Sequence, residues 1–304
     1  MELNDTKNDE SVIYEPNNRI IMGFGFSYRA FTLNLGFGFS FLNQNDQELG
    51  KTSYFDAQGN VYMKKVATNL FFLTYQGYYL DSHSREEIGL DPVGDSRAFR
   101  RDIRQSTLGF SSVYIFNNDK FSYRASFTQD AWQKKSAGSW LAGGYATYFT
   151  VRGDSSLIPT ALDSLFENTL QIKQGNFVDI GLQGGGVYTL VIGKHFFATI
   201  SGVVGFGASI VKNGLEIPPD NELEQHSKVG PGYSIQARYA MGYNSKRNYF
   251  GFSYNNETSW SAQSESDRFG WSVGNFRLNF AHRFNTRVVI LDKIFDGVSY
   301  NFKN

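Results

Sequence analysis

The stretch Phe31-Thr-Leu-Asn-Leu-Gly-Phe-Gly-Phe-Ser-Phe41 places an apolar side chain at every odd position, with small or polar residues between them. Because successive side chains of a strand point to opposite faces, this stretch predicts a β-strand with one apolar and one polar face. The strip of Phe and Leu must be buried, either in a protein core or in lipid. Similar alternation recurs along most of the chain, so this choice decides the fold.

The composition favours lipid-facing strands. The chain has 304 residues, with 28 Phe, 18 Tyr and 31 Gly against 6 Pro and 4 Met. This balance is typical of strands with aromatic girdles and tight turns. The mean hydropathy is −0.36, and no apolar run reaches the roughly 18 residues of a membrane-spanning helix. A membrane β-barrel escapes that criterion, because half of each strand is polar.

Charge and cysteine content exclude several classes of protein. The net charge of zero gives no indication of nucleic-acid binding. The absence of cysteine excludes disulfide scaffolds and thiolate metal sites. The four histidines are isolated and lack the spacing of metal ligands, so we expect no metal and no cofactor.

Alternation and turn residues predict twelve strands. Their ranges are 19–28, 31–41, 52–62, 66–80, 105–116, 121–129, 139–150, 177–192, 196–210, 232–243, 248–258 and 271–284. On strand 66–80 the residues Phe71, Leu73, Tyr75 and Tyr79 align on the apolar face. The only helical pattern, of one or two turns, covers residues 159–169. Short turns alternate with long polar loops, as in bacterial outer-membrane barrels.

We therefore predict an all-β protein, a single antiparallel transmembrane β-barrel of about 12–14 strands in a bacterial outer membrane. Residues 1–18 form a polar N-terminal segment, residues 19–285 the barrel, and residues 286–304 a C-terminal extension. A soluble sandwich or propeller is the alternative. It is less consistent with the chain, since no blade-length repeat is present and exposed Phe strips of this size would aggregate.

The strand count leaves a margin of about two. If the short turns lie on one side, strand 19–28 needs a preceding strand of opposite direction, whereas residues 1–18 resemble a loop. We expect that the first strand, together with a signal peptide, precedes this chain. The irregular link at residues 151–176 also falls at the end where a short turn is expected.

Charged side chains at inward positions are the main candidate site. They are Arg124, Arg238, Arg277 and Arg283, with the acidic Asp56, Asp179 and Glu257. One interpretation is a water-filled lumen whose arginines favour anions, as charged rings do in pores. The other is that these charges pair with one another and fill the lumen, as in small barrels. Both interpretations remain open at this stage.

Two further groups of residues are assigned to the barrel ends. Lys134 and Lys135 interrupt the alternation and either attract anionic solutes or lipid phosphates at a mouth or form a solvated loop tip. Aromatic residues near strand ends are expected at the membrane–water interface, where the ring is half buried and its polar tip stays wet. They are Tyr28, Tyr79, Trp140, Tyr148, Tyr243 and Trp271.

Catalytic motifs are weak. The glycine-rich residues 181–186 lack the strand-to-helix context of a phosphate loop, and glycines inside a strand more often mark a bend or a close backbone approach. A barrel hydrolase needs a serine, a histidine and a polar orienting group that face one way. His282 with Ser253 or Asn255 comes nearest, but His282 is expected to point outward. We expect no enzyme.

Several segments resemble a family of uncharacterised Bacteroidota outer-membrane barrel proteins known only as a domain of unknown function. They are Tyr14-Glu-Pro-Asn17, Gly23-Phe-Gly-Phe-Ser-Tyr28, Leu33-Asn-Leu-Gly-Phe-Gly38, Tyr75-Gln-Gly-Tyr-Tyr79, Lys120-Phe-Ser-Tyr-Arg-Ala125, Gln133-Lys-Lys-Ser-Ala-Gly-Ser139, Ser155-Ser-Leu-Ile-Pro159 and Asn275-Phe-Arg-Leu-Asn-Phe-Ala-His-Arg-Phe284. The resemblance covers residues 14 to 285. It implies an outer-membrane barrel with a signal peptide and one upstream strand, and it implies no activity. Residues 285–304 extend past it.

Three functional hypotheses follow. The first is a passive, porin-like transport barrel with an arginine-containing lumen. The second is a non-conducting structural or assembly scaffold that binds a partner through its outer loops. The third is a barrel-embedded lipid hydrolase. The expected partners are outer-membrane lipid and either small solutes or a protein, without nucleic acid.

Overall fold

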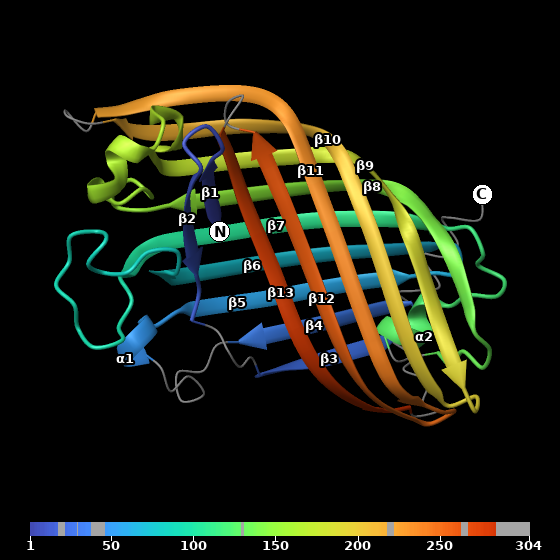
Figure 1. Ribbon diagram of the computed structural model, residues 1–304. Coiled ribbons are helices and arrows are strands. Elements are labelled where there is room, and N and C mark those ends of the chain that lie inside the picture. The colour runs from blue at the N-terminus through green and yellow to red at the C-terminus, as the bar shows by residue number, and fades with distance from the viewer. Residues whose placement is uncertain are drawn as a thin grey trace.

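The computed structural model describes residues 1–17, 22–28, 30–37, 46–128, 131–217, 222–262 and 267–283. They form thirteen strands and a few short helices (Figure 1). The strands are β1 (Glu2–Asp5), β2 (Glu10–Glu15), β3 (Met22–Tyr28), β4 (Phe31–Phe37), β5 (Ser53–Tyr62), β6 (Val66–Leu80), β7 (Phe99–Ile115), β8 (Ala137–Arg152), β9 (Ile172–Ile192), β10 (Phe196–Ile217), β11 (Glu222–Asn244), β12 (Asn248–Ala262) and β13 (Asp267–His282). The helices are α1 (Asp46–Leu49), α2 (Tyr123–Phe127), η2 (Thr160–Leu165) and η3 (Asn168–Leu170).

Ten of these strands close a β-barrel. Strands β6 to β13 pair antiparallel in chain order, and β1 pairs with both β13 and β2. A short ladder between β2 and β6, which pairs Tyr14 with Leu80, completes the ring. The fold prediction of an antiparallel barrel is confirmed. The sheet holds thirteen described strands, within the predicted range, but the closed ring contains ten.

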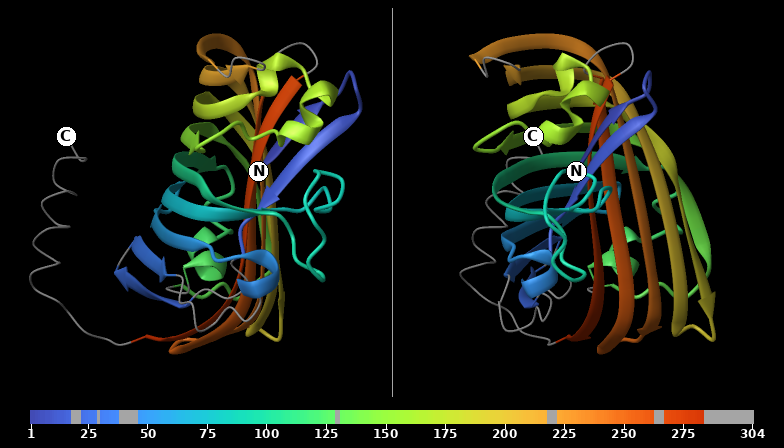
Figure 2. Two further views of the ribbon diagram at one scale, coloured as in Figure 1. Left: turned by 90° about the vertical axis from the view of Figure 1, so that its left-hand side faces the viewer. Right: turned by 60° about the vertical axis from the view of Figure 1, so that its left-hand side comes forward.

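The sheet continues beyond β6 through β5, β4 and β3. These strands form one edge of the sheet, and the β1–β2 hairpin forms the other edge (Figures 1 and 2). Because each pair is antiparallel, β3 and β13 run in the same direction. No ladder joins β3 to β13 among the described residues. The first four residues of β13 pair with β1. Along the rest of β13, the wall therefore has a seam between β13 and β3.

The two barrel ends differ in their connections. The turns at residues 63–65, 193–195 and 245–247 lie at one end, called here the short-turn end (lower right in Figure 1). The connections 81–98 and 153–171 lie at the other, the long-loop end. Gly193 has a φ of +57° and Lys194 one of +67° in the β9–β10 turn, the left-handed pair typical of a tight hairpin. The predicted alternation of short and long connections holds only in part, because the long connection 116–136 between β7 and β8 also lies at the short-turn end.

An apolar band covers much of the outer surface, on β3 and on β6 to β13. Alternate residues of neighbouring strands expose large apolar side chains, as the period of two requires. The band includes Phe24, Phe26, Leu70, Phe72, Leu108, Phe110, Tyr148, Ile180, Leu182, Leu190, Ile200, Val204, Phe206, Ile235, Tyr239, Met241, Phe250, Phe252, Phe276, Leu278 and Phe280. Leu182 is 78% exposed and Phe280 is 74% exposed, so the protein itself does not cover these side chains. Among the described residues, no helix is long and apolar enough to cross a membrane.

Two apolar layers fill the inside of the barrel near its ends. At the long-loop end, Phe149, Phe177, Phe269 and Trp271 stack with ring centroids 4.5 to 5.9 Å apart. The β1–β2 hairpin and the β8–β9 connection pack on them through buried apolar side chains, among them Leu3. At the short-turn end, α2 and its flanking residues pack against the wall. The interior is therefore closed at both ends by side chains.

Several sequence predictions are wrong. Residues 121–129 were predicted as a strand, but residues 123–127 form α2 and lie inside the barrel. A segment that is buried on every side shows no reliable alternation of apolar and polar residues. In α2 the ring centroids of Tyr123 and Phe127 lie 4.9 Å apart, and their spacing of four residues is that of neighbours on one helix face. Because residues 121–129 are not a strand, every later strand runs in the opposite direction to that predicted. The long connection 153–171 therefore lies at the long-loop end, and not at the end where a short turn was expected.

The N-terminal prediction and one strand face are also wrong. Residues 1–18 were predicted as a loop but contain β1 and β2. On β6, Leu73 and Tyr75 point inward and are buried, whereas Leu70 and Phe72 face outward. The wide ring of an inward Tyr fills space in the barrel interior, so aromatic identity alone does not fix the outer face. Some predicted positions lie outside the described residues. They are the start of the first predicted strand at residues 19–21, the end of the second at residues 38–41, Phe284 and the extension 286–304.

Candidate functional site

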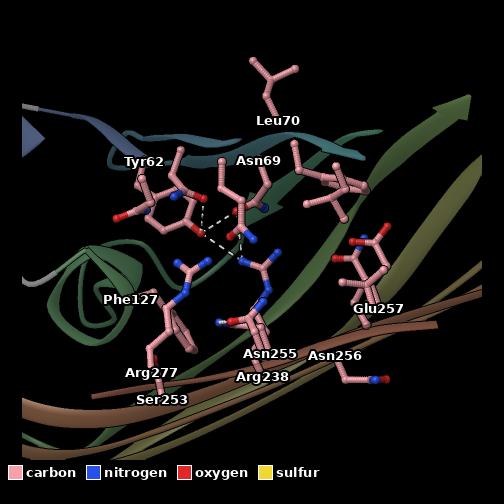
Figure 3. Close-up of a pocket in the computed structure, with 18 of the residues that line it drawn as sticks. Tyr62, Asn69, Leu70, Phe127, Arg238, Ser253, Asn255, Asn256, Glu257 and Arg277 are labelled. Atoms are coloured by element: carbon pink, nitrogen blue, oxygen red, sulfur yellow. Dashed lines mark hydrogen bonds between the residues drawn. The ribbon is translucent and has the colours of Figure 1, made fainter. Parts of the chain in front are cut away.

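Between the two apolar layers the barrel contains a polar chamber (Figure 3). Its volume is about 90 Å³, enough for several water molecules. The polar lining residues are Asn34, Gln58, Asn60, Tyr62, Asn69, Gln236, Arg238, Ser253, Asn255, Asn256, Glu257, Asn275, Arg277 and Asn279. Amide side chains dominate this list, and each can donate and accept hydrogen bonds.

Arg238 is held by a fixed network on β5 and β6. Its Nη1 donates to Tyr62 Oη at 2.9 Å and to Asn69 Oδ1 at 3.0 Å. The Tyr62 hydroxyl donates to the same Asn69 oxygen at 2.5 Å. Glu257, the second charge on this side, pairs in register with Gln236 on the neighbouring strand. The opposite charges of Arg238 and Glu257 lie in one chamber, which reduces the cost of burying either.

Arg277 and Asp56 form a second pair of charges across the chamber. The Nη2 of Arg277 on β13 lies 3.9 Å from Oδ2 of Asp56 on β5. That oxygen also accepts a hydrogen bond of 3.0 Å from Gln58. The other carboxylate oxygen of Asp56 is buried without a hydrogen bond among the described residues. The chamber lining supplies two arginines and one carboxylate, and Asp56 beside it supplies the second carboxylate, so these four charges balance.

The remaining inward candidates lie elsewhere. Asp179 is fully buried in the wall, where Ser259 and Ser261 donate to it at 3.4 and 3.1 Å. Arg283 lies at the short-turn end and donates to Ala131 O at 3.0 Å and to Asn244 Oδ1 at 2.9 Å. Arg124 lies on α2 rather than on a strand, so the assignment of Arg124 to the strand face of the lumen is wrong.

A groove along the seam in the barrel wall adjoins the chamber. Its volume is about 520 Å³, and it lies between Gly23–Gly25 of β3 and residues 274–279 of β13. Asn34, Asn275, Arg277 and Asn279 line both the groove and the chamber. On β3 both faces are exposed from residue 23 to residue 27. Among the described residues, the groove and the chamber therefore share part of their lining.

The segment that closes the short-turn end is tied to the wall by hydroxyl groups. Ser126 on α2 shares a hydrogen bond of 2.6 Å with Thr199, and Tyr123 shares one of 3.2 Å with Ser201. Asn244 on the rim donates to the carbonyls of Ala125 and Ala131. These contacts hold residues 121–131 inside the barrel mouth, as far as they are described.

Lys134 and Lys135 are exposed on the rim that follows this segment. The Nζ of Lys134 lies 4.6 Å from the ring centroid of Trp132. Trp132 in turn stacks on His195 at 5.1 Å and donates its indole N–H to Lys194 O at 2.8 Å. Both lysines therefore face the surroundings of the barrel rather than its lumen.

Five of the six predicted interface aromatics are partly or largely exposed. Trp140, Tyr148 and Tyr243 point outward and are exposed, and Tyr28 and Tyr79 are half buried. The assignment of Trp271 is wrong, because it is 4% exposed and packs inside against Phe149. It shares the odd, inward parity of Arg277 on the same strand, a signal that could have placed it inside.

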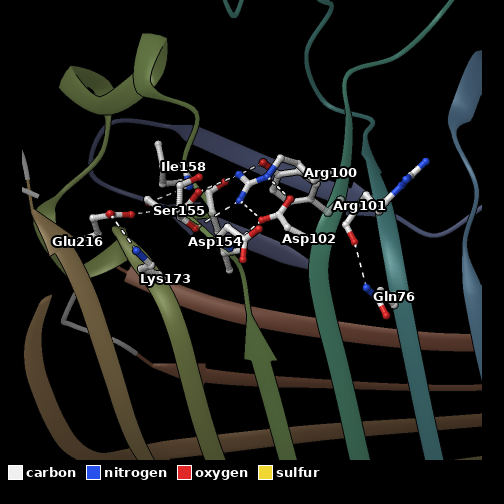
Figure 4. A network of polar contacts seen from close by, with 12 residues as sticks. Gln76, Arg100, Arg101, Asp102, Asp154, Ser155, Ile158, Lys173 and Glu216 are labelled. Carbon is white, nitrogen blue, oxygen red and sulfur yellow. Dashed lines mark hydrogen bonds and ion pairs between the residues drawn. The ribbon is translucent and has the colours of Figure 1, made fainter.

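A network of polar contacts orders the long-loop end (Figure 4). Arg100 donates to both oxygens of Asp102 at 2.9 and 2.7 Å and to the carbonyl of Ser156 at 2.9 Å. The Asp154 amide donates to Asp102 at 2.8 Å. The hydrogen bonds from Arg100 lower the pKa of the Asp102 carboxyl from 3.8 to about 2. Glu216 accepts from the Ser156 amide and pairs with Lys173, which extends the network.

The candidate hydrolase residues do not come together. Ser253 is buried and points into the barrel, where Asn279 donates to it at 3.2 Å. His282 is exposed, and its Nδ1 lies 2.7 Å from Asn248 Oδ1. Among the glycines, a side chain on Gly185 would collide with the carbonyl of Gly202, which confirms the close backbone approach expected for residues 181–186.

Sequence reasoning missed several chamber residues. Tyr62 and Asn69 bind Arg238, and Asn60, Asn255 and Asn275 complete the lining. Polar identity at inward strand positions is the signal that would have found them. The seam had no sequence signal, because it depends on strand pairing across the whole sheet.

Comparison with protein families places most of the chain in one family. The family model described as "Domain of unknown function (DUF4421)" matches residues 1–284. No curated protein matches the chain. The resemblance found in the sequence is thereby confirmed at the level of the family, while the bacterial phylum stays a prediction.

Proposed function

The chain belongs to the DUF4421 family, a domain of unknown function, and on that premise we propose that it is a non-conducting outer-membrane barrel that serves as a scaffold. The observation that carries this proposal is the double closure of the barrel interior by apolar layers. A solute on the axis would have to pass the stack of Phe149, Phe177, Phe269 and Trp271, and then α2.

The outer surface supports a location in the membrane. Its exposed band of large apolar side chains extends over β3 and over β6 to β13. Soluble monomers rarely expose apolar patches above a few hundred Å². Membrane barrels carry such a band, flanked by aromatic residues, and Trp140 and Tyr243 lie at its short-turn edge. The tight turns at one end and the longer loops 81–98 and 153–171 at the other support an outer-membrane location, since such barrels carry this asymmetry.

The lumen charges support a closed interior rather than a selective pore. Arg238 is bound by Tyr62 and Asn69, and Arg277 lies beside Asp56. Arginines that are neutralised and immobilised leave little field for attracting free anions. The geometry thus favours the scaffold over the passive pore that the sequence also suggested.

The ordered long-loop end supports the presentation of a surface to a partner. The Arg100–Asp102 network fixes the β8–β9 connection against the strand ends. The β6–β7 connection exposes Leu90 and Val93, which are 44% and 59% exposed. The Arg97 amide ties this second connection to Glu48 O at 2.8 Å. Exposed apolar side chains on an anchored loop are typical of a binding surface.

Conductance across a planar bilayer tests the proposal. We expect no stable single-channel steps at a protein load at which a general porin gives many. Stable steps that disappear in the variant Arg238→Ser, Arg277→Ser would overturn the scaffold and establish the pore. A detergent-refolded sample with native heat-modifiability on gels is the control for correct folding.

A second candidate function rests on the seam. Since Asn34, Asn275 and Arg277 line both the chamber and the lateral groove, a small polar group can reach the chamber from the membrane. We expect glycerol 3-phosphate or glucose, as charged and neutral probes, to raise the unfolding temperature of the native chain but not of Asn275→Leu. If neither probe at millimolar concentration stabilises the native chain, this candidate fails and the scaffold remains.

A further inference from the structure

A groove on the outside of the barrel, separate from the chamber, lies at the short-turn edge of the apolar band. Its volume is about 630 Å³, and Phe116, Trp140, Tyr188 and Ile200 form its apolar walls. Its floor consists of Gly186 and Gly202, which are directly paired in the β9–β10 ladder. The small floor between large walls makes a trough wide enough for a hydrocarbon chain.

The floor is open because the outward positions there have no side chains. A side chain on Gly202 would meet nothing within 4 Å, and one on Gly186 would make only ordinary contacts with the Trp140 ring. Trp140 is 76% exposed and pairs in register with Gly186. The fold therefore tolerates larger residues at both glycines, and their absence leaves a hollow in the lipid-facing wall.

The rim next to this groove is strongly basic. Among the described residues of the short-turn connections, eight exposed side chains are cationic: Lys64, Lys65, Lys120, Lys134, Lys135, Lys194, Lys246 and Arg247. Asp119 is the acidic residue described there, and it pairs with Lys64 at 2.7 Å. The rim as described thus has a large excess of positive charge, although the chain as a whole is neutral.

Lys120, Lys134 and Lys135 belong to the part of the rim that adjoins the groove. Asn117 and Gly138 line the groove, and the Asn117 side chain donates to Gly138 O at 2.7 Å. The Asn117 amide donates to Ser139 Oγ at 2.9 Å. These bonds bring the two ends of the β7–β8 connection together at the head of the groove, and Lys120, Lys134 and Lys135 belong to this connection.

We propose that this groove binds one anionic glycerophospholipid, with an acyl chain on the glycine floor and the phosphate at Lys120, Lys134 and Lys135. Charge complementarity identifies the occupant, because cationic side chains at a membrane surface attract anionic headgroups. A second copy of the chain fits poorly, since a two-fold contact through this face would bring the same lysines together. The inference rests on the membrane location given above, but not on closure of the axis.

Native mass spectrometry of the delipidated, detergent-solubilised chain tests this site with phosphatidylglycerol and phosphatidylcholine of identical acyl chains. We expect one phosphatidylglycerol to be retained in preference to phosphatidylcholine by roughly 30- to 150-fold, the range expected of two to three lysines at an anionic surface. Inorganic phosphate should not displace it, because the acyl chain contributes to binding. Displacement by phosphate would overturn the lipid assignment.

Two matched pairs of variants separate the headgroup from the acyl chain. Lys134→Gln, Lys135→Gln should abolish the preference, whereas Lys64→Gln, Lys65→Gln on the same rim should keep it. Gly202→Leu should reduce the binding of both lipids, whereas Gly184→Leu, at an outward position beyond the groove, should not. Equal effects within either pair would overturn the site.

Failure here is distinguishable from failure of the proposed function. A chain that is silent in conductance but binds both lipids equally keeps its scaffold role and loses this site. A conducting chain with selective lipid retention keeps the site and loses the scaffold role.

Discussion

Arg238 illustrates how single residues hold the chamber together. Its guanidinium is bound to Tyr62 and Asn69, and Glu257 shares the chamber with it. Removing one partner of a buried charge pair leaves the other uncompensated, which costs far more than the pair itself contributes. The chamber is therefore expected to be sensitive to single charge changes and tolerant of paired ones.

We expect Arg238→Ala to lower the free energy of unfolding by about 1–3 kcal/mol, because Tyr62 and Asn69 lose their donor and Glu257 stays in the chamber without its neutralising charge. Adding Glu257→Gln should recover part of this loss. Urea unfolding of the refolded barrel, followed by tryptophan fluorescence, measures both effects. A loss below about 0.5 kcal/mol, the size of an ordinary surface substitution, would show that the chamber is solvated enough to screen Arg238.

The two tryptophans Trp271 and Trp140 offer a direct test of which face is inside. Trp271→Ala should cost about 3–5 kcal/mol, because it leaves a cavity in the stack with Phe149. Trp140→Ala removes an outward ring that no protein atoms cover on its exposed side, and we expect a smaller loss. Thermal unfolding in the same detergent compares the two. A reversed order would mean that the faces of β8 and β13 are exchanged.

At the level of elements, the β8–β9 connection depends on one carboxylate. Asp102 has a pKa lowered from 3.8 to about 2 by the hydrogen bonds from Arg100. A group whose pKa is lowered by folding stabilises the folded state fully above its ordinary pKa, and this contribution is lost as pH falls through the folded value. Anchoring of residues 154–156 should thus weaken between about pH 4 and pH 2.

Hydrogen exchange of the Asp154 amide, which donates to Asp102, measures this effect. Relative to the intrinsic rate, protection should fall as pH decreases from 4 to 2, and Asp102→Asn should show reduced protection at all pH values. Unchanged protection in that variant would place the anchoring elsewhere, for example in the contact of Ser156 with Glu216.

The accuracy of sequence reasoning differed between elements for physical reasons. A period of two predicted β4, β5, β10 and β12 well, because each has one face in the interior and one outside. It failed for α2, which is surrounded by barrel wall and rim, and for β1 and β2, which are too short to show a period. Inward charges such as Arg277 were predictable from parity, but their partners Asp56 and Tyr62 depend on how the sheet closes.

The whole molecule combines a closed axis, an opening in its wall and unequal ends. The seam is the stretch where β3 and β13, which run in the same direction, are not paired in the described structure. Unpaired strand edges are costly in hydrocarbon, where no water satisfies the backbone groups. The chamber behind the seam is polar, whereas the surface beside it exposes Phe24, Phe276 and Leu278. Both the scaffold and the lateral binding proposal require this outer surface to contact lipid.

Spin labels at neighbouring positions on β10 test that contact most directly. The chain has no cysteine, so Val203→Cys, Val204→Cys and Lys194→Cys can each be labelled at one site. In a bilayer we expect the Val204 label to collide with oxygen and to be shielded from a water-soluble nickel chelate, the Val203 label to be shielded from both, and the Lys194 label to be open to nickel. Free access of nickel to the Val204 label would contradict a lipid-facing surface, and with it the account of this protein as a membrane barrel.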